Sequence, residues 1–187
     1  MKHVLFIQGA GAGAYQEDKE LADSLQNTLG PSCEVHYPVM PNEEDAPYDD
    51  WKQQIEDELT KVRGPVALVG HSVGASILAR YLSETKARQP VTGIFFIANP
   101  FWGGDGWRYE GWEALALPQD LAATFPRGAL LFLYHCRDDE VVPFEHLELY
   151  AHLLPDATVR AFDTGGHQLD DNISVVAQDI KSLSYAD

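Results

Sequence analysis

Short apolar runs alternate with longer segments of helical periodicity along the whole chain, and no other feature constrains the fold as strongly. Six runs are predicted to be buried strands bounded by Gly, Pro or polar turns: Val4–Ile7, Cys33–Tyr37, Val66–Val69, Gly93–Ala98, Leu130–Tyr134 and Thr158–Phe162. Helices are expected near Tyr15–Leu29, Tyr48–Val62, Ser72–Glu84, Leu117–Phe125, Glu145–Leu153 and Asn172–Leu183. Strands that alternate with helices form right-handed crossovers and a parallel sheet covered on both faces. The sequence therefore predicts a three-layer α/β/α sandwich with a mainly parallel sheet of about six strands.

The length of 187 residues and the absence of repeats or linkers predict one domain over residues 1–187. The first apolar run, Val4–Ile7, is shorter than the core of a signal peptide, and no stretch is apolar for 18 residues. We therefore expect a soluble cytoplasmic protein. The formal charge of -16 argues against nucleic acid or an anionic membrane surface as a partner, because both repel a polyanion.

The sequence contains no spacing typical of a metal or disulfide framework. Cys33 and Cys136 belong to no CxxC pair and are expected to be free thiols. The histidines at positions 3, 36, 135, 146 and 152 are expected to be surface or core residues rather than ligands. We predict neither a metal nor a cofactor.

The segment GHSVG follows the third predicted strand and places Ser72 between Gly70 and Gly74. A serine on a sharp turn from strand to helix is exposed above the sheet, and glycines on either side prevent collisions with the neighbouring strand or helix. Because a serine hydroxyl is a poor nucleophile at neutral pH, it needs a base to take its proton. The alternative is that Ser72 is only a small polar residue in a turn.

Candidates for that base and its partner lie at other strand ends, where parallel sheets bind ligands. Asp139 follows the fifth strand and His167 follows the sixth, so the chain order is Ser, acid, His, as in the α/β hydrolases. His167 would take the serine proton, and a carboxylate would fix the tautomer of its imidazole. From the residues alone that carboxylate could also be Asp138, Glu140 or Asp105.

These segments resemble a known family. GHSVGASILARYLSE, DDEVVP, GGHQL and YPVMPNEEDAPYDDW are similar to the corresponding segments of the small serine hydrolases typified by retinoblastoma-binding protein nine and its bacterial relatives. The resemblance covers nearly the whole chain and implies an α/β-hydrolase fold without a large lid and serine hydrolase activity without a cofactor. It selects Asp139, which stands four residues before Pro143, as the acid. The partner binding in the family's name is not implied, because an L-x-C-x-E segment is absent.

The glycine-rich loop GAGAGA after the first strand allows two interpretations. By resemblance, the N–H groups of Ala10 and Val73 form the oxyanion hole; because Gln8–Gly9 replaces the His-Gly of most relatives, Gly11 is the alternative donor. The loop also satisfies G-x-G-x-x-A, a dinucleotide-binding pattern, but no carboxylate ends the next strand to hold a ribose. His71, beside Ser72, is expected to point away as filler.

Aromatic residues concentrate in the segment Asn99–Leu117, which follows the strand next to Ser72. Phe101, Trp102, Trp107 and Trp112 are predicted to line a substrate pocket, because aromatic walls bury much apolar area. Alternatively, some of these rings only cover the edge of the sheet.

The sequence thus predicts a serine hydrolase that cleaves a small carboxylic ester, thioester or amide through an acyl-enzyme. Two alternatives stay open: a binding or regulatory protein on a hydrolase scaffold with little turnover, and a dinucleotide-dependent oxidoreductase. The partner is a small acyl substrate; the sequence does not indicate the oligomeric state.

Overall fold

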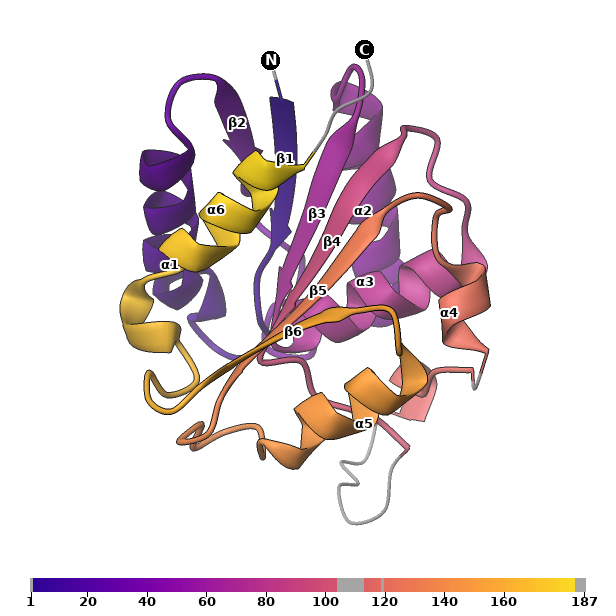
Figure 1. The fold of residues 1–187 in the computed structure, drawn as a ribbon. Helices are drawn as coiled ribbons and strands as arrows, with labels where there is room; N and C mark the ends of the chain where they lie inside the picture. The colour runs from indigo at the N-terminus through magenta and orange to yellow at the C-terminus, as the bar shows by residue number, and fades with distance from the viewer. Residues whose placement is uncertain (1, 104–112, 119, 184–187) are drawn as a thin grey trace.

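A computed structural model describes residues 2–103, 113–118 and 120–183. Its centre is a sheet of six strands in the order β2-β1-β3-β4-β5-β6, in which every neighbouring pair is parallel (Figure 1). The strands are β1 (Lys2–Ile7), β2 (Cys33–His36), β3 (Val66–His71), β4 (Val91–Ile97), β5 (Leu130–Cys136) and β6 (Thr158–Phe162). The predicted parallel sheet is confirmed.

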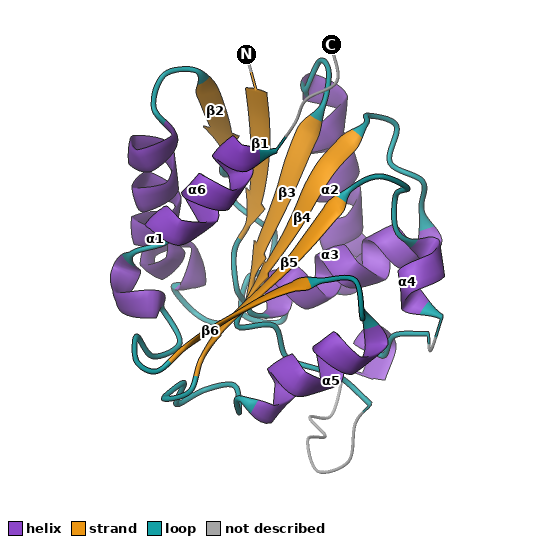
Figure 2. Ribbon diagram, in the orientation of Figure 1, coloured by secondary structure: helices purple, strands orange, loops and turns teal. Residues whose placement is uncertain are grey.

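Helices cover both faces of the sheet (Figure 2). The α-helices are α1 (Ala14–Leu29), α2 (Tyr48–Lys61), α3 (Val73–Glu84), α4 (Leu121–Thr124), α5 (Glu145–Leu153) and α6 (Ser174–Ser182), with short 3₁₀ helices η1 (Glu113–Leu115) and η2 (Leu169–Asp171). One face packs against α1 and α6, and the other packs mainly against α2 and α3. This arrangement confirms the three-layer sandwich. None of the described helices is long and apolar enough to cross a membrane.

The pleat of the central strands divides the core into two apolar layers. On β1, Val4 and Phe6 pack into the layer with α1 and α6, whereas Leu5 and Ile7 pack into the layer with α2 and α3. Each of these four side chains is fully buried. Because successive side chains of a strand point to opposite faces, a strand covered on both sides must be apolar, as the buried part of β1, Val4–Ile7, is.

Three expectations from the sequence are wrong in detail. The strand expected to be buried over Cys33–Tyr37 is β2, at the edge of the sheet, and only its residue Cys33 is buried. The strand Thr158–Phe162 is not buried: β6 is the last strand of the sheet, and four of its five residues are exposed. The helix expected over Leu117–Phe125 is shorter, because α4 starts only at Leu121 and ends at Thr124. Pro126 disfavours helical backbone at the residue before it, and Phe125 is extended with ψ 153°.

Parallel strands bring all their carboxyl ends to one edge of the sheet. The loops after β1, β3, β5 and β6 therefore meet there, and they carry the residues that the sequence analysis singled out.

Candidate active site

Ser72 stands at the turn between β3 and α3 with strained backbone angles, φ 50° and ψ -126°. A Cβ on Gly70 would lie 2.6 Å from the Cα of Ala75, and a Cβ on Gly74 would lie 2.0 Å from the carbonyl oxygen of Gln8. Both contacts are with backbone atoms that cannot move away cheaply. The expectation that these glycines prevent collisions with strand and helix is confirmed.

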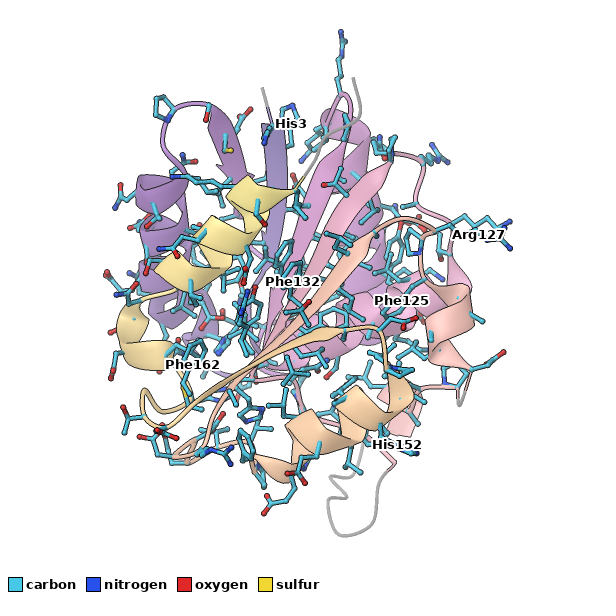
Figure 3. All side chains as sticks on the ribbon, in the orientation of Figure 1. His3, Phe125, Arg127, Phe132, His152 and Phe162 are labelled. Atoms are coloured by element: carbon cyan, nitrogen blue, oxygen red, sulfur yellow. The ribbon has the colours of Figure 1, made fainter. Side chains whose placement is uncertain are left out.

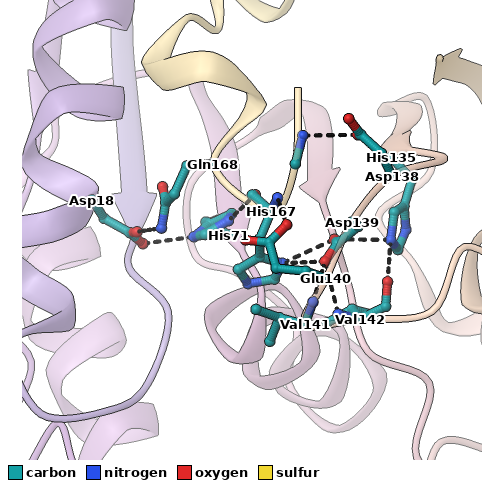
Figure 4. A network of polar contacts seen from close by, with 11 residues as sticks. Asp18, His71, His135, Asp138, Asp139, Glu140, Val141, Val142, His167 and Gln168 are labelled. Carbon is teal, nitrogen blue, oxygen red and sulfur yellow. Dashed lines mark hydrogen bonds and ion pairs between the residues drawn. The ribbon is translucent and has the colours of Figure 1, made fainter. Parts of the chain in front are cut away.

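Asp139 and His167 come together from the loops after β5 and β6 (Figure 4). The Nδ1 atom of His167 lies 2.9 Å from Oδ2 and 3.1 Å from Oδ1 of Asp139. Because an ionised carboxylate only accepts, Nδ1 carries the proton, and Nε2 keeps a free lone pair. The contact thus selects the tautomer of His167 that can act as a base.

Both oxygen atoms of the Asp139 carboxylate accept hydrogen bonds from more than one donor. Oδ1 accepts the backbone N–H groups of Val141 and Val142, both at 2.8 Å. Oδ2 contacts His167 and also the Nε2 of His135, at 3.1 Å. Burial would raise the pKa of Asp139, but the hydrogen bonds from His135 and His167 hold it well below its usual range. Asp139 is therefore an anion at neutral pH.

His167 is buried, and its loop is held by the acids on either side of Asp139. Burial lowers the pKa of His167, against the opposing hydrogen bond from Asp139, so the imidazole is neutral near pH 7. Asp138 accepts the N–H of Gly166 at 2.9 Å and that of Gly165 at 3.3 Å. Glu140 accepts the N–H of His167 at 3.3 Å.

His71 is not inert filler that points away, as the sequence analysis expected. Its Nδ1 lies 2.8 Å from the Oδ2 of Asp18, and its Nε2 lies 3.1 Å from the carbonyl oxygen of His167 (Figure 4). Both side chains are almost completely buried. Asp18 also accepts the N–H of Gly9 at 2.7 Å and the amide of Gln168 at 3.1 Å. The pair therefore joins the loops that carry Ser72, His167 and the glycine-rich segment.

The contacts of His71 and His135 could not be predicted from the sequence, because a residue's neighbours in the fold are not evident from its position in the chain. His71 and Asp18 are separated by 53 residues. His135 was also expected to be a surface or core residue, and it is a core residue that contacts the acid. The available signal was position: His71 directly precedes Ser72, and His135 stands four residues before Asp139 at a strand end.

The glycine-rich loop is fastened by Glu43. Its carboxylate accepts the N–H groups of Gly13 at 2.9 Å and Tyr15 at 2.8 Å, and the side-chain amide of Gln8 at 2.9 Å. These N–H groups belong to the start of α1, where a dinucleotide would place its pyrophosphate. An internal carboxylate already binds there, which argues against the dinucleotide alternative.

One further contact of this loop bears on the oxyanion donor. The N–H of Gly11 donates to the carbonyl oxygen of Glu43 at 2.8 Å. Within the described residues, the N–H groups of Ala10 and Val73 donate to no protein atom.

Ser72 and His167 line one cavity of about 200 Å³ together with Gly9, Ala10, Ala14, Glu17, Asp18, His71, Glu140, Val141 and Gln168. No hydrogen bond joins the two side chains among the described contacts; such bonds are often long in free enzymes and shorten when substrate binds. Glu17 and Glu140 make this lining acidic, whereas the carboxylate of Asp18 is paired with His71.

Phe101 and Trp102, the two predicted aromatic residues that the structure describes, are not part of this lining. Trp102 is 6% exposed, and its Nε1 donates to the Oγ of Ser76 at 2.9 Å. Phe101 packs edge to face against Tyr150, with ring centroids 5.2 Å apart. Both rings thus contribute to the core around α3 and α5. Trp107 and Trp112 lie outside the described residues, as does Asp105.

Comparison with known structures shows the same fold. The ydeN gene product of B. subtilis matches with a TM-score of 0.69 and 20% identity, over 97% of this chain and 98% of that one. A meta-cleavage product hydrolase from Pseudomonas fluorescens matches with a TM-score of 0.73 and 16% identity, over 97% and 91%. An esterase from Exiguobacterium antarcticum matches with a TM-score of 0.69 and 16% identity, also over 97% and 91%.

Comparison of the sequence with curated proteins gives no match. The model of the serine hydrolase family, however, matches residues 22–173, a range that includes Ser72, Asp139 and His167. With most of its length matched to this model and the fold shared with hydrolases and esterases, the chain belongs to the serine hydrolase family.

Proposed function

We propose that the protein hydrolyses a small carboxylic ester, thioester or amide through an acyl-enzyme formed on Ser72. The observation that supports this most strongly is the hydrogen bond from the Nδ1 of His167 to Asp139, next to a serine on a strained turn. These contacts support a Ser-His-Asp triad with a nucleophile elbow. Its integrity favours an enzyme over a binding protein that keeps only the scaffold.

In the first half of the reaction, the Oγ of Ser72 attacks the substrate's carbonyl carbon while its proton passes to the Nε2 of His167. The tetrahedral intermediate collapses when the bond to the leaving group breaks, and His167 gives that proton to the leaving group. Asp139 stabilises the imidazolium that forms between these steps.

In the second half, a water molecule attacks the acyl-enzyme and passes a proton to His167. The bond to the Oγ of Ser72 then breaks, the carboxylic acid leaves, and His167 returns the proton to Ser72. All atoms are accounted for without any cofactor.

The oxyanion would accept hydrogen bonds from the N–H groups of Ala10 and Val73. Gly11 is the weaker candidate, because its N–H already donates to Glu43. The N–H of Gly9 also has a partner, the carboxylate of Asp18. Donors that hold no other bond are free to stabilise charge as it develops in the transition state.

The cavity supports a small, uncharged acyl group. Its volume of about 200 Å³ is below the range of roughly 300–1,000 Å³ typical of drug-sized ligands. Its carboxylates would repel an anionic substrate. A role of Trp107 and Trp112 as a further pocket wall stays a prediction.

The test is the rate of hydrolysis of acetyl, butyryl, hexanoyl and longer esters and thioesters by wild type, Ser72→Ala and Ser83→Ala. Ser83 is the matched control, since it stands on the same helix α3 and its hydroxyl, among the described contacts, bonds only the carbonyl of Arg80. We expect short acyl groups to be preferred, and Ser72→Ala to lose on the order of 10⁴- to 10⁶-fold in kcat. Equal loss in both variants would contradict the proposal.

A further inference from the structure

Three side chains with metal-binding atoms meet at the edge of the sheet, away from the cavity at Ser72. His3 lies on β1, and Glu34 and His36 lie on the edge strand β2. The parallel register pairs His3 with Glu34, and His36 follows Glu34 by two residues. Since side chains two residues apart on a strand point to the same face, the fold holds all three on one side of the sheet.

The distances among the three groups match those of a metal's ligands. The Nδ1 of His3 lies 3.0 Å from the Nε2 of His36, and the Oε2 of Glu34 lies 3.6 and 3.9 Å from these two atoms. Two ligands that each lie about 2.0–2.1 Å from a tetrahedral Zn²⁺ are about 3.3–3.4 Å apart. The side chains therefore need shifts of only a few tenths of an ångström to bind a common ion.

We propose that His3, Glu34 and His36 bind one divalent transition-metal ion, of which Zn²⁺ is the representative. Two imidazoles and one carboxylate suit zinc and its neighbours, whereas Mg²⁺ and Ca²⁺ require oxygen ligands. The ion would connect the edge strand β2 to β1, with water in the fourth position. Its function would be to stabilise this edge of the sheet, independently of the hydrolytic site.

Access and charge favour the same interpretation. The side chains of His3 and His36 are 15% and 19% exposed and that of Glu34 is 51% exposed, so an ion can enter from solvent. The net charge of -16 attracts cations to the protein. The competing explanation of the short N–N distance is a hydrogen bond between two neutral imidazoles, and this explanation requires no affinity for zinc.

A metal site could not be predicted from the sequence, because the two histidines are 33 residues apart and match no ligand spacing. Only the pairing of β1 with β2 brings them together.

Calorimetric titration of the chelator-treated full chain with Zn²⁺ tests the proposal. We expect one ion per chain in the wild type. Loss of a residue that only hydrogen-bonds one of a metal's ligands weakens metal binding by roughly 10- to 100-fold. Loss of a ligand itself, in His36→Ala or His3→Ala, should therefore weaken zinc binding by at least about 100-fold. Glu34→Gln, which preserves the shape of the side chain, should also bind more weakly.

The control is His152→Ala, because His152 is an exposed histidine on α5, far from His3 (Figure 3). This variant should bind zinc like the wild type, and zinc should raise the melting temperature of both. Ester hydrolysis by His36→Ala should equal that of the wild type, which shows that the variant folds. Zinc affinities that are equal in wild type, His36→Ala and Glu34→Gln, or no binding by the wild type, would overturn the proposal.

Discussion

Replacement of Asp139 by Asn separates the role of a negative charge from that of shape. In the wild type, Oδ1 accepts the N–H groups of Val141 and Val142, and Oδ2 faces the rings of His135 and His167. The amide oxygen of Asn can keep both backbone bonds. Its NH₂ group must then point at two imidazole nitrogens that donate in the wild type.

The imidazole of His167 can accept from that NH₂ group only if Nδ1 loses its proton to Nε2. The ring would then be in the wrong tautomer to take the proton of Ser72. In the serine proteases the equivalent change lowers kcat by about 10⁴-fold. Since each factor of ten corresponds to about 1.36 kcal/mol, we expect a loss of about 5.4 kcal/mol of transition-state stabilisation.

Asp138→Asn is the matched control. The carboxylate of Asp138 accepts only the backbone N–H groups of Gly165 and Gly166 among the described contacts, one on each oxygen. The amide oxygen of Asn can keep the shorter of these bonds, from Gly166. This variant should retain activity within about tenfold, a change of about 1.4 kcal/mol. The assay is kcat for a short-chain ester, together with the nitrogen NMR shifts that report the tautomer of His167. An inactive Asp138→Asn beside an active Asp139→Asn would refute the reasoning.

Three further predictions concern the surroundings of this site. Asp18→Ala leaves buried His71 without its carboxylate and should lower the free energy of unfolding, measured in urea, by about 3–5 kcal/mol. The control Asp23→Ala removes an exposed carboxylate and should lower it by less than about 1 kcal/mol, so equal losses would contradict a buried pair. Gly74→Ala forces a Cβ against the backbone of Gln8 and should lower stability by at least about 1–3 kcal/mol, so an unchanged melting temperature would be inconsistent with the close contact. Because burial lowers the pKa of His167 and the base must be unprotonated, kcat/KM should fall with decreasing pH only below about 6.5; a midpoint above that value would argue against the assignment.

The fold could be predicted from the sequence because local patterns determine it. Four of the six strands, β1, β3, β4 and β5, are mostly apolar runs buried within the sheet, and the spacing of the six strands leaves room for a helix between each pair. The exposure of β2 and β6 could not be predicted, because the sequence does not reveal which strands lie at the edges of the sheet. The exposed Arg160 of β6 pairs with Asp179 of α6, a contact between positions 19 residues apart.

The candidate site was predicted where a residue's role depends on its place at a strand end, as for Ser72 and His167, whereas Asp139 was selected among neighbouring acids only by the resemblance to a known family. It was missed where the role depends on distant partners. Asp18 lies on the buried side of α1, and nothing in the periodicity of that helix distinguishes its contact with His71. For Trp102 the position after β4 was misleading. It suggested a place in the pocket wall, but the ring is packed in the core, where it donates a hydrogen bond to Ser76.

The central claim is that Ser72 is the nucleophile of a serine hydrolase. A fluorophosphonate probe reacts with a serine that a neighbouring base activates, and the mass of the intact protein reports the adduct. We predict that the wild type gains one adduct, located at Ser72, and that folded Ser72→Ala gains none. Equal labelling of the two proteins, or no labelling of the wild type, would contradict the account.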